Sequence, residues 1–322
     1  MSRTILPATL ITIIIAMGSV LFVKGSYPSL SIQARNLPER LGYPADAKLL
    51  IVHADDLGMA HSVNAATIKA FESGLVSSGS IMVPCPWLPE IAAYARSHPE
   101  ADLGLHLTLT SEWSSFRWGP VLPKNRVSSL LDRNDYFHLT EAEAASHADV
   151  KEVETEVRAQ IDRARTFGIQ PTHLDSHMGT LYQNKALFET LLRVAAENKL
   201  PVRMSKEFFA RAQFLPSLLG PEDVVLDRII SIEPEVRPED WSRFYADAIK
   251  GIQPGVTEMV VHIAYDDEEM RAITIDHPNW GSAWRQRDFQ FFTGDSFRKL
   301  LQDNHIKLIT WREIGKMQYH AP

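Results

Sequence analysis

Short apolar runs alternate with amphipathic stretches along most of the chain. Buried strands are predicted where a run is continuous or alternates with period two, at residues 48–53, 76–83, 102–110, 172–177, 202–204, 258–263 and 307–310. Helices are predicted where apolar residues recur at helical spacing, at residues 61–73, 87–97, 150–167, 185–198, 241–250 and 296–304. The proline-containing stretch at residues 205–240 is predicted to be irregular.

Strands that alternate with helices in this way predict a parallel α/β fold. One closed or nearly closed β/α barrel fits the length of the region. The chemistry of such barrels gathers at the carboxyl ends of the strands. Candidate functional residues should therefore lie where the predicted strands end.

The first 47 residues follow a different pattern. Residues 5–23 carry no charge and lie between Arg3 and Lys24. An uncharged run of about 20 residues can span a bilayer. It predicts an N-terminal apolar helix within residues 1–24, as a signal anchor or a signal peptide, followed by a linker at residues 25–47. We therefore expect the domain at residues 48–318 to belong to the cell envelope, anchored to the inner membrane or exported to the periplasm or beyond.

Composition excludes one class of function. The 322-residue chain has a net charge of -7, so it lacks the basic surface of a nucleic-acid-binding protein. Its single cysteine, Cys85, leaves no partner for an intrachain disulfide and is interpreted as a small apolar residue.

Histidine and aspartate residues follow or end several of the predicted strands, as the barrel hypothesis requires. They are Asp55 and Asp56 after the first strand, His106 on the third, His173, Asp175 and His177 on the next, and His262 on a late strand. One carboxylate and two imidazoles with open positions suit Zn²⁺, and also Mn²⁺, Fe²⁺ or Co²⁺. The pattern therefore predicts a metal site at this end of the barrel.

A bound cation also explains the adjacent acids Asp55 and Asp56, because it neutralises one of them. Asp56 is interpreted as the ligand, and Asp55 remains free as a base on water that the metal activates. Successive residues of an extended strand point in opposite directions, so the two carboxylates need not face the same atom. His106 is the second ligand, whereas spacing leaves open whether His173 or His177 is the third.

Three segments in combination carry a resemblance to a known family. They read VHADDLGMAHSVNAATIKAFESGLVSSGSIMV, LGLHLTLTSEW and PTHLDSHMGTLY. In this order and spacing they resemble the YdjC-like carbohydrate deacetylases, also called the ChbG/HpnK family, over roughly residues 48–315. The resemblance implies a distorted β/α barrel of the polysaccharide-deacetylase type. It also implies hydrolysis of N-acetyl groups on an amino-sugar glycan, with one divalent metal ion, Mg²⁺ or Zn²⁺.

The resemblance also implies roles for individual residues. Asp56, His106 and His177 map to the metal ligands, and Asp55 maps to the general base. His262 is retained as a general acid, although the following Ile263-Ala264 replaces the Pro-Gly common in the family, so the loop there must differ. The remaining candidates, expected beside the ligands or against substrate, are His173, Asp175, Arg287, Trp113 and Tyr182. His53, two residues before Asp55, shares its side of the strand and is expected to influence its pKa.

Two other interpretations stay open. A metal-dependent amidase or phosphoesterase acting on another substrate would show the same ligands. A membrane-tethered glycan-binding module could keep the fold without turnover. All the implied catalytic and metal-binding residues are present, which favours an enzyme whose partner is an N-acetylated glycan.

Overall fold

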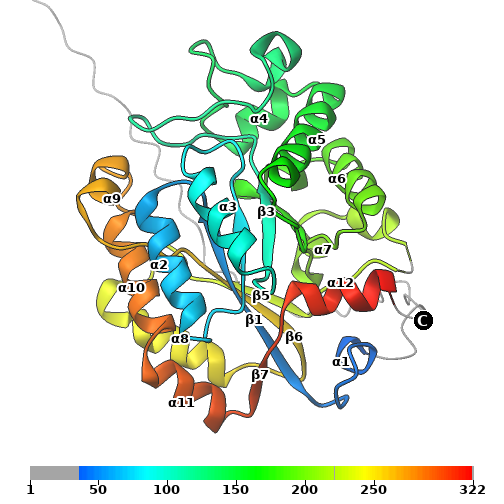
Figure 1. Ribbon diagram of the computed structural model, residues 1–322. Helices are drawn as coiled ribbons and strands as arrows, with labels where there is room; N and C mark the ends of the chain where they lie inside the picture. The colour runs from blue at the N-terminus through cyan, green and yellow to red at the C-terminus, as the bar shows by residue number, and fades with distance from the viewer. Residues whose placement is uncertain (1–35, 221, 321–322) are drawn as a thin grey trace, which may run out of the picture. The chain divides into compact units, whose positions relative to one another are not determined.

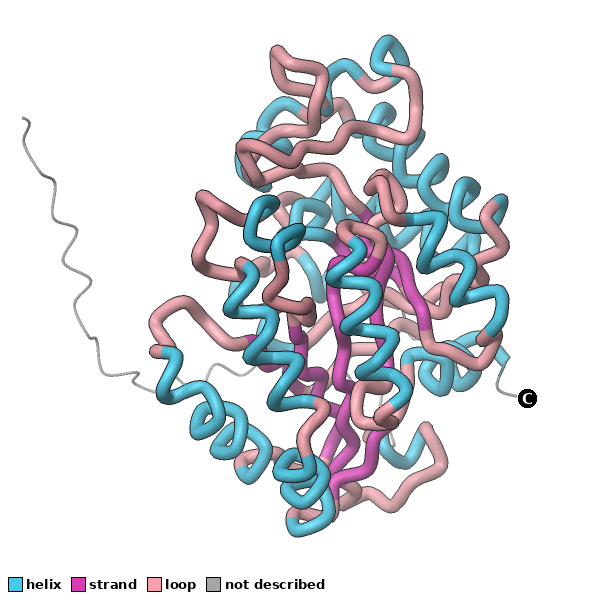
Figure 2. Tube along the Cα trace, turned by 60° about the vertical axis from the view of Figure 1, so that its left-hand side comes forward, coloured by secondary structure: helices cyan, strands magenta, loops and turns pink. Residues whose placement is uncertain are grey.

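A parallel sheet of seven strands forms the centre of the computed structural model, which describes residues 36–220 and 222–320. The strand order is β4-β3-β2-β1-β6-β5, and β7 pairs with the amino-terminal half of β1 (Figure 1). The strands are β1 (Lys48–Leu57), β2 (Ser78–Ile81), β3 (Leu103–Leu107), β4 (Leu174–Ser176), β5 (Arg228–Ser231), β6 (Gly255–Val261) and β7 (Ile306–Leu308). Figure 2 shows the strands at the centre, with helices and loops around them.

Helices connect most of the strands, which gives the parallel α/β architecture that the sequence predicts. They are α1 (Leu37–Arg40), α2 (His61–Glu72), α3 (Leu88–Ser97), α4 (Glu141–His147), α5 (Val150–Thr166), α6 (Lys185–Asn198), α7 (Lys206–Arg211), α8 (Trp241–Lys250), α9 (Glu268–Ile273), α10 (Ser282–Phe292), α11 (Asp295–Asp303) and α12 (Trp311–His320). The six predicted helices are confirmed to within one residue at each end. The others are short or carry buried polar residues, which conceal the helical pattern.

The sheet curls but does not close through its named strands. Its two edge strands, β4 and β5, do not pair with each other within the described residues. Residues 201–206 lie between them: Val202 bridges to Leu174 of β4, and Ser205 bridges to Leu226, just before β5. The predicted strand at residues 202–204 is thus reduced to isolated bridges. The closed barrel becomes a curled sheet whose gap is spanned by irregular chain.

Both faces of β1 are buried, as its continuous apolar run predicts. Leu49 and Ile51 pack on one side with Trp311 of α12, whereas Leu50 and Val52 pack on the other side. His53 and Asp55 continue the side of Leu49 and Ile51 by the period of two. The first strand therefore has an apolar amino-terminal half and places polar groups in the interior near its carboxyl end.

The N-terminal predictions lie largely outside the described residues. The apolar run at residues 5–23 is among the residues for which no structure is described. Residues 36–47, assigned to the linker by the sequence, include helix α1, whose Leu37 packs in the same apolar cluster as Trp311. Across residues 36–220 and 222–320, every helix is too short or too polar to cross a membrane.

Gly104 of β3 gives a test of this packing. A methyl group added there would lie 2.6 Å from Cδ2 of the buried His173 ring, closer than real side chains approach. We expect Gly104→Ala to lower the free energy of unfolding by about 1–3 kcal/mol, because the ring or the strand must move. Thermal and denaturant unfolding measure this loss.

Gly315→Ala in α12 is the matched control. The added methyl group would meet its nearest atom, Cδ of Pro201, at 3.5 Å, an ordinary contact. Alanine also favours the helix over glycine, so stability should stay constant or rise slightly. Equal stability of the two variants would contradict the tight approach of β3 to His173.

Candidate active site

A cavity of about 780 Å³ lies where the carboxyl ends of several strands meet. Asp55 and Asp56 reach it from β1, His106 from β3, and His177 and His262 from the residues that follow β4 and β6. The structure thus gathers side chains that are far apart in the sequence at one end of the sheet. Ligand sites of parallel α/β proteins are commonly found in this position.

A break in β1 brings both adjacent acids into the cavity. The register between β1 and β2 shifts between Ala54 and Leu57, and Asp56 has a φ of 71°. A shift of this kind marks a bulge, and aspartate tolerates the left-handed region better than most residues. The regular alternation of an extended strand therefore stops at Asp55. Both carboxylates approach His106, although their other partners differ: Asp55 contacts Arg203, and Asp56 contacts Arg285.

Three potential metal ligands converge on one point. Oδ1 of Asp56 lies 3.5 Å from Nε2 of His106 and 3.6 Å from Nδ1 of His177. The other carboxylate oxygen, Oδ2, accepts a hydrogen bond of 2.7 Å from Nη2 of Arg285. Oδ1 is buried and has no hydrogen-bond partner among the described residues. A buried carboxylate oxygen without a donor calls for a ligand, and a small cation fits between these three atoms.

Two further carboxylates fix the orientation of the imidazoles. Nδ1 of His106 lies 2.7 Å from Oδ1 of Asp175, and Nε2 of His177 lies 3.0 Å from Oε2 of Glu112. If each ring donates its proton to the carboxylate behind it, the opposite nitrogen presents its lone pair towards Asp56. Metal-binding histidines usually have this arrangement. Asp56, His106 and His177 therefore fit a divalent metal ion.

The charges around the three residues also favour a cation. Burial raises the pKa of Asp56, but the Arg285 guanidinium and His177 outweigh it and hold this pKa well below its usual range. Burial lowers the pKa of His177, but Glu112 and Asp56 outweigh it and raise this pKa to about 10. A proton on His177 then occupies the place of a metal ion, so metal binding must release it and weakens in acid.

Asp55 lies beside this group with its own partners. Oδ1 of Asp55 is 3.0 Å from Nη1 of Arg203 and 3.1 Å from Nε2 of His53, and Oδ2 is 3.7 Å from Nε2 of His106. Burial raises the pKa of Asp55, but Arg203, His106 and His53 together outweigh it and hold this pKa well below its usual range. Asp55 therefore stays ionised and can accept a proton at neutral pH.

His262 also lines the cavity, with its backbone N–H donating to Oδ2 of Asp288 at 3.0 Å. Burial lowers the pKa of its ring to about 4; Asp56 opposes this shift and Arg285 adds to it. The ring is thus neutral at neutral pH before any reaction. A general acid must first gain a proton, which constrains the role predicted for His262.

A profile of the YdjC-like protein family matches residues 49–303 of the chain. The chain belongs to the YdjC-like family. A Thermus thermophilus relative named carbohydrate deacetylase is 32% identical over 289 residues, which cover 87% of this chain and 98% of the relative. An Enterococcus faecalis relative of the same name is 34% identical over 277 residues, or 83% and 98% of the two chains. The resemblance expected from the three sequence segments is confirmed.

A solved structure extends this likeness to the fold. The crystal structure is that of an Enterococcus faecalis V583 protein named for cellobiose-phosphate cleavage. It has a TM-score of 0.70 and 25% identity, and the match covers 83% of this YdjC-like chain and 99% of that protein. The curled parallel α/β architecture is therefore shared with another chain of known structure.

Not every predicted residue of this YdjC-like protein reaches the cavity. Trp113 and Tyr182 line it, and Asp175 lies directly behind His106. His173 does not line it: its ring stacks on Trp311, with 5.2 Å between centroids. Arg287 also does not line it and lies 5.2 Å from the centroid of Trp241. Residues two apart on a helix point to different sides, so Arg285 takes the place in the cavity that the sequence analysis gave to Arg287.

Three site residues were missed by the sequence analysis: Glu112, Arg203 and Arg285. Arg285 shares a face of α10 with Asp288 and Phe292, so its helical spacing carried a signal. Arg203 is a charged residue inside an otherwise apolar predicted strand, and Tyr182 donates a hydrogen bond of 2.9 Å to its carbonyl. A buried charge of this kind requires a partner.

Glu112→Gln tests the arrangement behind His177. The neutral amide no longer draws the proton to Nε2 as the carboxylate does, so Nδ1 is a poorer and less oriented ligand. We expect Zn²⁺ affinity to fall about 10- to 100-fold, as measured by competition with a chelator.

The control for this change is Glu141→Gln. Glu141 also lines the cavity, but its side chain makes no hydrogen bond to either imidazole in the described structure. The affinity of the Glu141→Gln variant for Zn²⁺ should match that of the wild-type protein. An equal loss in both variants would mean that general charge, and not the contact with His177, controls the affinity.

Proposed function

We propose that this protein is a metal-dependent hydrolase that removes N-acetyl groups from an amino-sugar-containing glycan or oligosaccharide. The central observation is the buried Oδ1 of Asp56, which has no hydrogen-bond partner among the described residues and lies near ring nitrogens of His106 and His177. The ionised Asp55 lies next to these groups, as a hydrolytic base should. The relatives that match over nearly their whole length are named carbohydrate deacetylases, which supports this substrate class.

Asp56, His106 and His177 would hold one divalent cation. Two nitrogen ligands favour Zn²⁺ over Mg²⁺, which prefers oxygen ligands. When bound, such a cation polarises the acyl carbonyl and lowers the pKa of water. Arg285 holds Oδ2 of Asp56, so Oδ1 stays directed towards the two imidazoles.

Asp55 is the group that accepts the proton of the attacking water. Its carboxylate is fixed by Arg203 and His53, and its Oδ2, which also accepts hydrogen bonds of 3.4 Å from Arg203, lies 3.7 Å from Nε2 of His106. Because its pKa is held low, Asp55 keeps the proton only briefly and passes it on towards the leaving nitrogen. Water thus adds a hydroxyl group to the acyl carbon, and its proton goes to the departing amine.

His262 is the second cavity group that can protonate the amine. Its neutral ring cannot donate at the start of the reaction. Negative charge develops on the acyl oxygen as the tetrahedral intermediate forms, and a nearby negative charge raises the pKa of an imidazole. His262 would therefore take up the proton that Asp55 received from the attacking water, and would deliver it to the nitrogen as the C–N bond breaks.

The walls of the cavity suit a sugar. Aromatic side chains line it on several sides, from Trp113, Tyr182, Phe208, Phe214 and Trp280. Rings of this kind pack against the apolar faces of sugars, while the polar groups at the strand ends contact hydroxyl and amide groups. Of the other aromatics near the strand ends, Trp118 and Trp284 are buried in the core and do not line the cavity.

The proposal is tested by acetate release from N-acetylated glycans, with Zn²⁺ or Mg²⁺ added. We expect acetate and free amine in equal amounts from the wild type. Asp55→Asn should lower turnover about 10²- to 10⁴-fold, because the amide cannot accept a proton, while its metal content is unchanged. Elemental analysis measures that content.

The alternatives give different results. Cleavage of phosphate esters or other amides without acetate release would make the protein another metal hydrolase. Glycan binding without turnover in any metal would make it a binding module. Loss of metal in Asp55→Asn would contradict the assignment of Asp55 as the base and Asp56 as the metal ligand.

We also propose that the protein acts in the cell envelope. The uncharged run at residues 5–23, between Arg3 and Lys24, supports an N-terminal anchor or signal. Cell fractionation should place the protein in the membrane or periplasm, and N-terminal sequencing of the mature protein separates the anchor from the cleaved signal. Recovery of the intact chain from the cytoplasm alone would overturn this location.

A further inference from the structure

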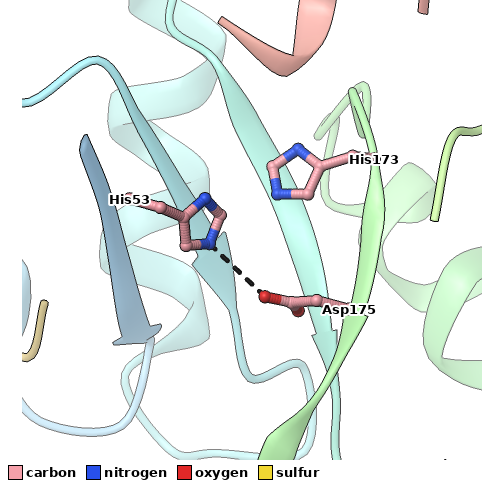
Figure 3. A group of neighbouring side chains, drawn as sticks. All are labelled: His53, His173 and Asp175. Carbon is pink, nitrogen blue, oxygen red and sulfur yellow. Dashed lines mark ion pairs between the residues drawn. The ribbon is translucent and has the colours of Figure 1, made fainter. Parts of the chain in front are cut away.

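The buried ring of His53 lies directly beneath the candidate site and is surrounded by oxygen atoms. Nε2 lies 3.1 Å from Oγ of Ser80, 3.1 Å from Oδ1 of Asp55 and 3.4 Å from Oδ2 of Asp175. Figure 3 shows the ring directed towards Asp175. Nδ1 lies 3.1 Å from Oγ of Ser78 and 3.4 Å from Oε1 of Glu258. Acceptors on both sides of a ring suit an imidazolium, which donates from both nitrogens.

Arg203 completes an alternating set of four charges with His53. Nη1 of Arg203 lies 3.0 Å from Oδ1 of Asp55 and 3.0 Å from Oδ2 of Asp175. Each carboxylate therefore contacts both cations, and each cation contacts both carboxylates. Without His53, two buried carboxylates would share a single positive charge, which burial makes unfavourable.

The neighbouring His173 has the opposite environment. Its ring lies 4.9 Å from that of His53, edge to face, and Nε2 has no hydrogen-bond partner among the described residues. Burial and the adjacent His53 hold the pKa of His173 well below its usual range. Burial also lowers the pKa of His53, but Asp175 and Asp55 raise it to about 10. Of these two histidines, His53 is therefore the one whose ring is protonated on both nitrogens.

A second metal site does not explain this cluster. His53, His173 and Asp175 have ligand atoms close enough for one ion. The guanidinium of Arg203 already contacts Oδ2 of Asp175, and a divalent cation beside it would be repelled. Both nitrogens of His53 also have oxygen partners. Arg203 and a protonated His53 thus supply the positive charge of this cluster, and no metal ion is needed to complete it.

We propose that His53 is a positioning residue whose fixed positive charge holds Asp55 and Asp175 in place for the reaction. Through Asp175, which contacts Nδ1 of His106, the same charge sets the orientation of a metal-binding ring. The role of His53 in the reaction rests on the proposed function, whereas its positive charge does not depend on that function. The groups that face this ring from neighbouring elements are Asp55 of β1, Ser78 and Ser80 of β2, His173 and Asp175 from the β4 segment, Arg203 beside β4, and Glu258 of β6.

Nitrogen NMR of the full-length protein, with ¹⁵N-labelled histidine, reads the charge directly. At about pH 8, where an exposed histidine is neutral, His53 should show two protonated ring nitrogens. His173 should show one protonated and one bare nitrogen. A neutral His53 at this pH overturns the proposal, whether or not the protein proves to be a deacetylase.

His53→Gln removes the charge and keeps a polar group. Asp55 and Asp175 then share Arg203 alone, so their carboxylates are held less firmly in place. We expect kcat to fall about tenfold or more, with little change in KM, since an orientation and not a substrate contact is lost.

His173→Gln is the matched control, because it changes a buried histidine next to His53 that has no ion pair with Asp55. It should lower the melting temperature without lowering kcat. An equal fall of kcat in both variants, or no fall in either, overturns the role of His53. If His53→Gln does not fold, the ¹⁵N signals of His53 in the wild-type protein decide whether this ring is charged, and a neutral ring overturns the proposal. Absence of acetate release from the wild type would refute the proposed function and leave the NMR result standing.

Discussion

The ion pairs of three buried carboxylates, Asp55, Asp56 and Asp175, are the interactions on which the rest of the site depends. Removal of one partner from such a pair costs about 3–5 kcal/mol, because it leaves a charge buried alone. Arg203 and Arg285 supply two of the partner cations, from opposite parts of the chain. Electrostatic compensation therefore ties the irregular chain beside β4, and the helix α10, to the end of β1.

The same constraint leaves the three carboxylates with different sets of partners. Asp175 contacts Arg203, His53 and His106. Asp55 contacts Arg203 and His53, and its Oδ2 also approaches His106. In Asp56, Arg285 holds Oδ2, whereas Oδ1 has no hydrogen-bond partner among the described residues. Two paired carboxylates thus lie next to one that keeps an oxygen available for coordination.

Periodicity predicted the parallel architecture and the position of the polar groups, because buried strands and amphipathic helices show strong patterns. It did not predict the left-handed conformation of Asp56, which depends on a bulge against β2. It also missed α10, because the buried face of that helix includes Arg285 and Asp288, which read as surface residues. Those polar residues are buried because tertiary partners neutralise or bond them. Such partners cannot be inferred from local sequence.

Two isolated bridges among the described residues, Leu174 to Val202 and Ser205 to Leu226, connect the chain in the gap of the sheet to its two edges. Between them, the chain that leaves after Lys206 and returns at Leu226 contributes Phe208, Phe214 and Leu215 to the cavity wall. None of these three side chains takes part in the ion pairs of Asp55, Asp56 and Asp175. The part of the wall that they form is therefore separate from the charged groups of the candidate site. This separation gives protein engineering a defined segment in which to alter glycan selectivity without rebuilding the chemistry.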